Sequence, residues 1–156
     1  MLKIIIYLGI ILFGLVFGTL IKNNANLLQP PGLKQRLATF LDTNIAETSP
    51  DTPFRELRTP QFKLSVKALY NRVIQAGIDL GWDVADFNAN SDTISFVVES
   101  AVFSFRDDVL VRVKAIDAKY STLYIQSKSR VGNADFAANS AHIQALIKTL
   151  RNESTN

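Results

Sequence analysis

The stretch VLVRVKAIDAKYSTLYIQSKS, residues 109–129, decides the fold of this chain. Within it, Val109–Ile116 places apolar side chains on one face and Arg112 and Lys114 on the other, and Tyr120–Ser129 repeats this alternation. A period of two is typical of a strand with one buried face and one solvated face. Because only a few residues separate the two segments, we predict an antiparallel pair of strands.

Two more strands are expected just before this pair. Thr93–Ser100 alternates in the same way, and Trp82–Phe87 is a shorter segment that precedes the polar turn Asn88–Asp92. Consecutive strands joined by short turns form an antiparallel meander. The sequence therefore predicts a roughly four-stranded antiparallel sheet.

Two helices are expected to flank the strands. The first is capped by Ser65 and ended by Gly81, and the second runs from about Asp135 to Arg151. A core stripe at helical spacing is formed by Val66, Leu69, Val73, Ala76 and Leu80 in the first, and by Phe136, Ser140, Ile143, Ile147 and Leu150 in the second. Such helices cover the apolar face of a sheet, so the predicted fold class is a two-layer α+β domain.

The boundaries of the domain follow from composition. The α+β domain is expected to span residues 62–151, followed by a disordered tail at residues 152–156. Residues 23–61 contain all five prolines and are rich in asparagine and threonine. Proline disfavours helix at the residue before it, so this part is predicted to be a tether, interrupted by a short amphipathic turn around Leu33–Leu41.

The amino-terminal run IIIYLGIILFGLVFGTLI, Ile4–Ile21, carries no charged side chain. A helix of about 20 apolar residues crosses a hydrocarbon core of roughly 30 Å. Residues 1–22 are therefore predicted to be a transmembrane anchor, and the alternatives are a cleaved signal peptide or a buried core helix.

Basic groups lie at both ends of this run. Lys3 and the terminal amine precede it, and Lys22, Lys34 and Arg36 follow it, so the positive-inside rule gives no decisive difference. We expect the amino terminus in the cytoplasm and the domain on the extracytoplasmic side of a bacterial inner membrane.

Composition limits the partners and cofactors of the chain. Its 17 basic and 14 acidic residues are interspersed, and no basic cluster alternates with aromatic residues, so no nucleic-acid partner is expected. The lack of cysteine excludes disulfides and thiolate metal sites. Metal-ligand spacings and nucleotide-binding fingerprints are missing too, so we expect no metal and no cofactor. The expected partners are the membrane itself and a protein or a small anionic ligand.

The densest polar segment, SKSRVGNADFAAN at residues 127–139, lies where the last strand meets the last helix. One interpretation of this segment is structural. In it, Asp135 caps the helix, Arg130 pairs with Asp135, and Asn139 holds the loop in place.

A functional interpretation of the same segment stays open. Arg130 and the helix N-terminus would frame a small anion-binding pocket, with Ser127 and Ser129 as further donors. A second polar cluster, RDD at residues 106–108, is expected in a turn with one carboxylate paired to Arg112 or Arg130. The candidate ligand-binding residues are Ser127, Ser129, Arg130, Asp135, Asn139, Asp108 and Arg112.

Catalytic residues are not assigned from the sequence. His142 is the only histidine, and a Ser–His–Asp triad would require it to reach Ser127 or Ser129.

Two motifs, FSFRDDVLVRV at residues 103–113 and SKSRVGNADFAANSAHI at residues 127–143, carry a family resemblance. In their order and spacing they resemble domain of unknown function 1499, an uncharacterised bacterial and plastid family, and the likeness spans roughly residues 65–151. The family's characteristic polar residues correspond to Asp107, Asp108, Arg112, Ser127, Ser129, Arg130, Gly132, Asp135 and Asn139. The resemblance implies a fold and a candidate site but no reaction, because no activity is established for the family. Many members carry a cysteine before the first helix, and the comparable residues here, 49–54, lack it.

Three functions are compatible with these features. The leading hypothesis is a membrane-anchored, non-enzymatic binding or scaffold module that presents the polar turn to a small anion, a lipid headgroup or a protein. The second is a hydrolase acting on an envelope substrate, with Asp135 or Asp108 as acid or base and Arg130 holding an anion. The third is a structural subunit of a membrane complex.

Overall fold

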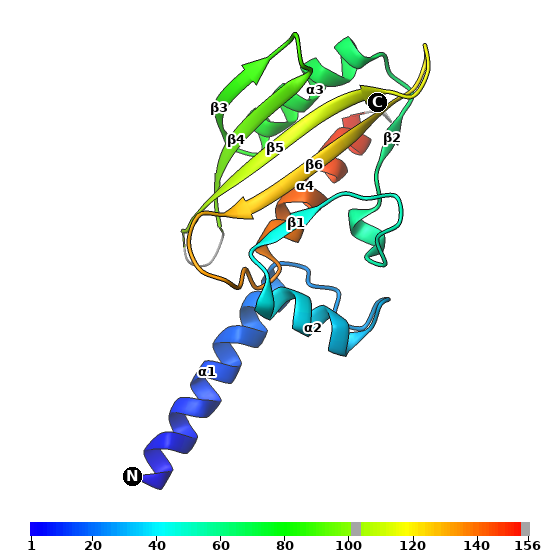
Figure 1. Cartoon of the computed structure of the whole chain (residues 1–156). Helices are drawn as coiled ribbons and strands as arrows, with labels where there is room; N and C mark the ends of the chain where they lie inside the picture. Colours follow the sequence, from blue (N-terminus) through cyan, green and yellow to red (C-terminus); the bar gives the residue numbers. More distant parts are fainter. Residues whose placement is uncertain (101–103, 154–156) are drawn as a thin grey trace.

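The computed structural model describes residues 1–100 and 104–153. Along the chain the helices and strands are α1 (Leu2–Lys22), α2 (Leu33–Asp42), β1 (Ile45–Glu47), the 3-10 helix η1 (Arg55–Leu57), β2 (Gln61–Phe62), α3 (Val66–Asp79), β3 (Asp83–Asn88), β4 (Thr93–Glu99), β5 (Arg106–Ala115), β6 (Ser121–Ser129) and α4 (Ala138–Glu153). Figure 1 shows α1 projecting from a body in which α3 and α4 lie on one side of the sheet.

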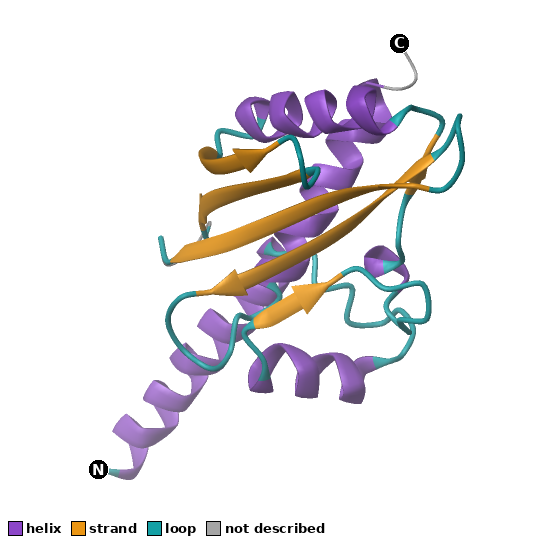
Figure 2. Cartoon of the chain, turned by 45° about the horizontal axis from the view of Figure 1, so that its top comes forward, coloured by secondary structure: helices purple, strands orange, loops and turns teal. Residues whose placement is uncertain are grey.

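The strands form one antiparallel sheet in the order β1-β6-β5-β4-β3, and β2 pairs with the first residues of β6. Figures 1 and 2 show α3 and α4 on one side of the strands, which agrees with the predicted two-layer α+β fold, and the strand order confirms the predicted meander. The expected number of four strands was too low, because β1 and β2 add to the free edge of β6 and make the sheet six-stranded.

The core lies between the sheet and the helices α3 and α4. In the pair that decides the fold, Val111 of β5 lies opposite Ile125 of β6, and both are fully buried. On the neighbouring strand, the Phe96 ring packs directly over Gly77 of α3, where any Cβ would collide with the ring. This close approach of helix and sheet requires glycine at position 77 unless the Phe96 ring moves.

The segment predicted to be a tether, residues 23–61, is folded onto the domain instead. Strand β1 pairs with residues 126–128 of β6, and Phe40 of α2 is buried against Phe54. The prediction failed because β6 offers an edge whose backbone groups need partners, and proline-rich segments can supply short edge strands.

A buried arginine organises this segment. The Arg36 side chain is 0% exposed and pairs with both carboxylate oxygens of Glu56, at 2.6 and 3.0 Å. It also donates to the carbonyl oxygens of Ala25, Gln29 and Pro30 and lies over the Phe54 ring. Arg36, one of the basic residues that follow the apolar run, therefore lies buried inside the domain, and its charge is neutralised there.

The polar segments differ in detail from the predicted boundaries. Residues 106–108, expected in a turn, open β5 and pair with both neighbouring strands. Helix α4 begins at Ala138 rather than Asp135, because Phe136 and Ala137 have positive φ angles of 50° and 67°. It continues to Glu153, so residues 152 and 153 belong to the helix rather than to a tail, and the rest of the predicted tail lies outside the described residues.

Helix α1 is long and apolar enough to cross a membrane or to be a signal sequence. Its side chains are exposed from Leu2 to Leu15, so it is not a core helix. Its last turns do contact the domain, because Thr19 and Leu20 are buried.

Glu56→Ala is expected to lower the free energy of unfolding by about 3–5 kcal/mol, because it leaves the buried Arg36 charge without its partner. The matched control is Asp108→Ala, which breaks an ion pair whose side chains are 45% and 54% exposed and should leave the midpoint almost unchanged. Denaturant titration of the full chain in detergent would measure both. Equal losses for the two variants would show that burial of the Arg36 pair does not matter.

Candidate functional site

The predicted polar segment is held together by the side-chain amide of Asn139 at the start of α4. Its Nδ2 donates to Ser129 Oγ at 3.0 Å and to the Asn44 carbonyl at 2.9 Å, and its Oδ1 accepts from Ser127 Oγ at 2.6 Å. Asn139 and Ser127 are fully buried. The amide thereby joins β6, α4 and the residue before β1, as a buried polar group with satisfied partners should.

Asp135 caps the N-terminus of α4. Its two oxygens accept the backbone N–H groups of Ala137 at 2.9 Å and Asn139 at 3.1 Å. Burial raises the pKa of Asp135, and the nearby Asp107 carboxylate adds to the rise, while the hydrogen bonds from Asn139 and Ala137 oppose it. The structural interpretation of Asp135 as a cap agrees with these contacts.

Arg130 does not pair with Asp135. Its guanidinium makes three contacts with the Asp108 carboxylate, at 2.6, 3.0 and 3.1 Å, in an exposed position. Hydrogen bonding to Asp108 raises the pKa of Arg130. Arg112 is exposed as well and lies opposite Tyr124 in the strand pairing.

The candidate residues thus separate onto two faces of the sheet. Ser127, Ser129, Asp135 and Asn139 are buried on the helix side, whereas Asp108, Arg112 and Arg130 are exposed. Because side chains alternate between the two faces along a strand, Asp108 and Ser129 point to opposite faces of the sheet. They cannot line the same pocket. The arrangement therefore does not bring Arg130 together with the two serines.

Two further polar residues were not included among the candidate ligand-binding residues. Asp107 is 1% exposed, and its Oδ2 lies 2.9 Å from Nε2 of the buried His142 on α4. Asp107 Oδ1 has no hydrogen-bond partner among the described residues. The strand alternation could have indicated this, because Asp107 shares its parity with Val109 and Val111 and must face the core.

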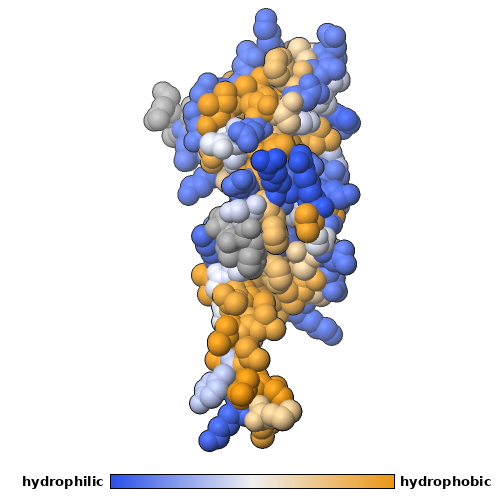
Figure 3. All heavy atoms as spheres, turned by 90° about the vertical axis from the view of Figure 1, so that its left-hand side faces the viewer, coloured by the Kyte–Doolittle hydropathy of each residue, from blue (hydrophilic) through white to orange (hydrophobic). Residues whose placement is uncertain are grey.

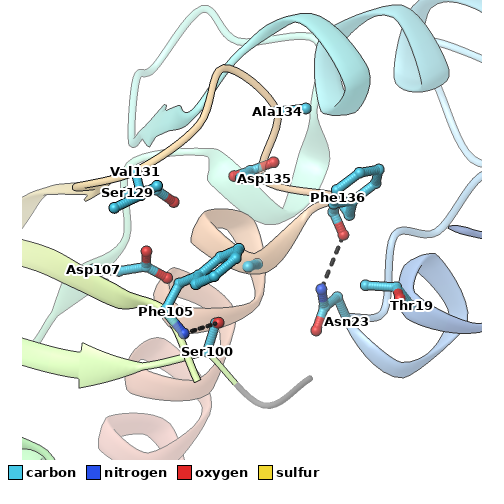
Figure 4. A pocket seen from close by; sticks show the side chains of 11 residues that line it. Thr19, Asn23, Ser100, Phe105, Asp107, Ser129, Val131, Ala134, Asp135 and Phe136 are labelled. Carbon is cyan, nitrogen blue, oxygen red and sulfur yellow. Dashed lines mark hydrogen bonds between the residues drawn. The ribbon is translucent and has the colours of Figure 1, made fainter. Parts of the chain in front are cut away.

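A small cavity lies where α1, β5 and the β6–α4 turn meet, and we call it the junction cavity. Its volume is about 20 Å³. Its polar lining comes from Ser100, Asp107, Ser129 and Asp135 of the domain, from Thr19 of α1 and from Asn23, which directly follows α1. Figure 4 shows these side chains around the hollow, together with Phe105 and Phe136. A cavity of this size holds about one water-sized group.

The end of α1 is built into this site. Asn23 is buried, and its Nδ2 donates to the Phe136 carbonyl at 2.9 Å, the contact drawn in Figure 4. The backbone N–H groups of Asp135 and Phe136 donate to the Thr43 and Phe40 carbonyls at the end of α2. The turn is therefore clamped between both amino-terminal helices, a contact that the sequence did not predict.

The side-chain contacts of His142 and the two serines do not form a Ser–His–Asp triad. His142 faces Asp107, while Ser129 Oγ is bonded to Asn139 and Ser127 Oγ donates to Asn139. Within residues 1–100 and 104–153, three or more His, Asp or Glu side chains do not gather in a way that could hold a metal ion. The geometry suits the binding of one small polar group better than nucleophilic chemistry.

Comparison with known proteins identifies one family. A family described as "Protein of unknown function (DUF1499)" matches residues 35–150, which confirms the resemblance of the two polar motifs. None of the curated proteins matches the chain.

Asn139→Ala is expected to lower the free energy of unfolding by about 3 kcal/mol or more, because it removes three hydrogen bonds and each buried unpaired group costs about 1–3 kcal/mol. Asn133→Ala, at an exposed position of the same turn, is the control and should change little. Chemical denaturation of the two variants side by side measures the difference. A loss of less than about 1 kcal/mol for Asn139→Ala, the net contribution of one ordinary hydrogen bond, would contradict this role of the amide.

Asp135 predicts a pH dependence of stability. Since its pKa is raised above the unfolded value of 3.8, the folded chain holds this proton to higher pH than the unfolded chain. Stability from this group is present below the unfolded pKa and is lost as the pH rises through the folded pKa. The unfolding free energy of the wild type minus that of Asp135→Asn should therefore increase as the pH falls from neutral toward about 4. A difference that decreases instead would mean that the charged form is favoured in the folded state.

Proposed function

Because the chain belongs to this family of unknown function, whose description assigns no activity, we propose a function from the geometry of the chain itself. The protein acts as a membrane-anchored binding module in which α1 holds the domain at the bilayer surface and the junction cavity receives a ligand group. The observation that carries the proposal is that one helix is both the apolar span and a wall of the cavity.

The contacts at the end of α1 favour an anchor over a cleaved signal. Removal of α1 would take away the fully buried Leu20 and leave apolar core surface exposed. Loss of Asn23 as well would leave the Phe136 carbonyl without its amide donor. A segment with such contacts contributes to the stability of the domain, whereas a signal peptide is discarded.

The length of α1 supports a domain seated close to the lipid. The part before the buried Thr19, from Leu2 to Gly18, is about 25 Å long, which is a little short of a hydrocarbon core of roughly 30 Å. Exposed apolar side chains next to this end of α1, Ile21 at 70% and Leu28 at 91%, can occupy the remaining depth. Figure 3 shows the apolar surface of α1 continuing onto the adjoining part of the domain.

For the orientation, we propose that the amino terminus is cytoplasmic and the domain extracytoplasmic, in a bacterial inner membrane. The burial of Arg36 against Glu56 supports this, since it removes one uncompensated basic group from the domain side of α1. Lys22 and Lys34 stay on that side, against Lys3 and the terminal amine on the other.

Binding is supported better than catalysis. The raised pKa of Asp135 is the one observation that favours a hydrolase, since a general acid must hold its proton. However, both Asp135 oxygens accept backbone N–H groups, and Asp108 and Arg130 pair with each other in an exposed position. A structural subunit of a membrane complex would use the other, exposed face of the sheet, where the cavity has no role.

The anchor is tested by washing membrane vesicles that contain the full chain with alkaline carbonate. We expect the protein to stay in the membrane fraction, with a mass that includes residues 1–22, because an apolar helix is not extracted by a change of pH or salt. The matched variant carries Leu12→Lys and Leu15→Lys, both at exposed positions of α1, and should move to the soluble fraction.

Recovery of the wild-type protein in the soluble fraction, or a mass that lacks α1, would overturn the proposed function. A second measurement separates binding from scaffolding, namely mass spectrometry of lipids and proteins that remain bound during purification in mild detergent. A stoichiometric protein partner with no bound small molecule would favour the structural subunit.

A further inference from the structure

We propose that the junction cavity binds one primary ammonium group, presented by the headgroup of a membrane lipid or by a small soluble amine. The inference deepens the proposed function and rests on it, because it names the chemical class of the ligand for the same cavity.

One carboxylate oxygen of Asp107 is unpaired. The side chain is 1% exposed, and His142 contacts only Oδ2, so Oδ1 lies buried without a donor among the residues that the structure describes. A buried carboxylate oxygen without a hydrogen bond is strongly unfavourable. Asp107 lines the junction cavity, so a hydrogen-bond donor placed there would complete its coordination.

The charged side chains that line the junction cavity are acidic. Asp107 and Asp135 both line the cavity, and among its described lining residues there is neither lysine nor arginine. Burial is the main cause of the raised pKa of Asp135, and the nearby Asp107 carboxylate adds to the rise. A cation is attracted by such a pair, and an anion is repelled. The anionic ligand expected from the sequence does not fit this lining.

The volume of the junction cavity and the acceptors on its wall suit a primary ammonium group. A volume of about 20 Å³ admits one water-sized group. A primary ammonium has about that size and brings three donors. Asp107 Oδ1 is the acceptor without a partner among the described residues, and the hydroxyl oxygens of Ser129 and Ser100 each accept one N–H already and keep a second lone pair. A quaternary trimethylammonium group is larger and has no donor at all. The cavity therefore discriminates between an ethanolamine and a choline headgroup.

The junction cavity lies at the domain end of α1. Thr19 and Asn23 form part of the wall, and they belong to the end of the span that meets the domain. Phe105 and Phe136 add apolar surface next to the polar groups. Headgroup amines lie in the polar layer just outside the hydrocarbon core, which is where the domain end of a spanning α1 would be.

The test uses the full chain in a detergent without amines. The unfolding midpoint is measured with increasing ethanolamine, N-acetylethanolamine and choline at constant ionic strength. A ligand that binds only the folded state raises the midpoint in proportion to RT ln(1 + [L]/Kd). We expect a saturable rise with ethanolamine, and at least a tenfold weaker effect with the uncharged amide and with choline.

Two neighbouring aspartates supply a matched pair of variants. Asp107→Asn should weaken ethanolamine binding at least tenfold, whereas Asp108→Asn should leave it unchanged, because Asp108 lies in an exposed position on the other face. If Asp107→Asn does not fold, the three probes on the wild type still decide. Equal effects of ethanolamine and N-acetylethanolamine on the wild type would overturn the proposal and leave a bound water as the partner of Asp107.

The source of the amine is distinguished with vesicles. The chain is reconstituted into phosphatidylcholine vesicles with or without phosphatidylethanolamine, and bound lipid is counted after purification. Enrichment of phosphatidylethanolamine that Asp107→Asn abolishes would support the lipid source, and ethanolamine binding without such enrichment would support a soluble amine. Carbonate extraction is independent of these results, so a chain that stays in the membrane but ignores ethanolamine refutes only the ammonium ligand.

Discussion

The buried ion pair between Arg36 and Glu56 is the contact on which the arrangement of α1 and the domain depends. Arg36 donates to three carbonyl groups in the connection between α1 and α2, and Glu56 belongs to η1, so one guanidinium joins parts of the chain with little regular structure. A buried charge is tolerated only while it is paired and hydrogen-bonded. The connection therefore cannot relax into a flexible linker, and α1 leaves the domain in a defined direction.

That rigidity gives the polar turn its surroundings. With the ends of α1 and α2 held in place, Asn23, Phe40 and Thr43 supply partners to the backbone of residues 135 and 136. The Asn139 amide fixes the same turn from the sheet side. These contacts occupy most of the polar motif. Among the described residues, Asp107 keeps one buried oxygen without a donor, beside the junction cavity at the end of α1. The stable turn and the junction cavity thus share the same residues.

The fold was largely predictable, because periodicity is a property of consecutive residues. Alternation in Thr93–Ser100 and Val109–Ser129 placed the right side chains in the core, and the helical stripes of α3 and α4 followed from their spacing. The edge strands β1 and β2 were missed, since two or three residues carry no periodic signal. The pairing of a carboxylate of residues 106–108 with Arg130 was predicted, and it is Asp108 that makes it. The predicted site is nevertheless divided between two faces, because Asp107 and Ser129 face the core and strand parity places Asp108 on the other side.

By itself the sequence determined an apolar helix of spanning length, an antiparallel sheet covered by two helices, and the polar segment between β6 and α4. These features follow from local spacing and composition. Only the tertiary structure decided which residues that segment contacts, that Arg36 is buried, and that Asp107 meets His142 beside the end of α1. The physical reason is that the partners of a buried charge are far apart along the chain, and only packing determines which of the possible partners a buried polar group reaches.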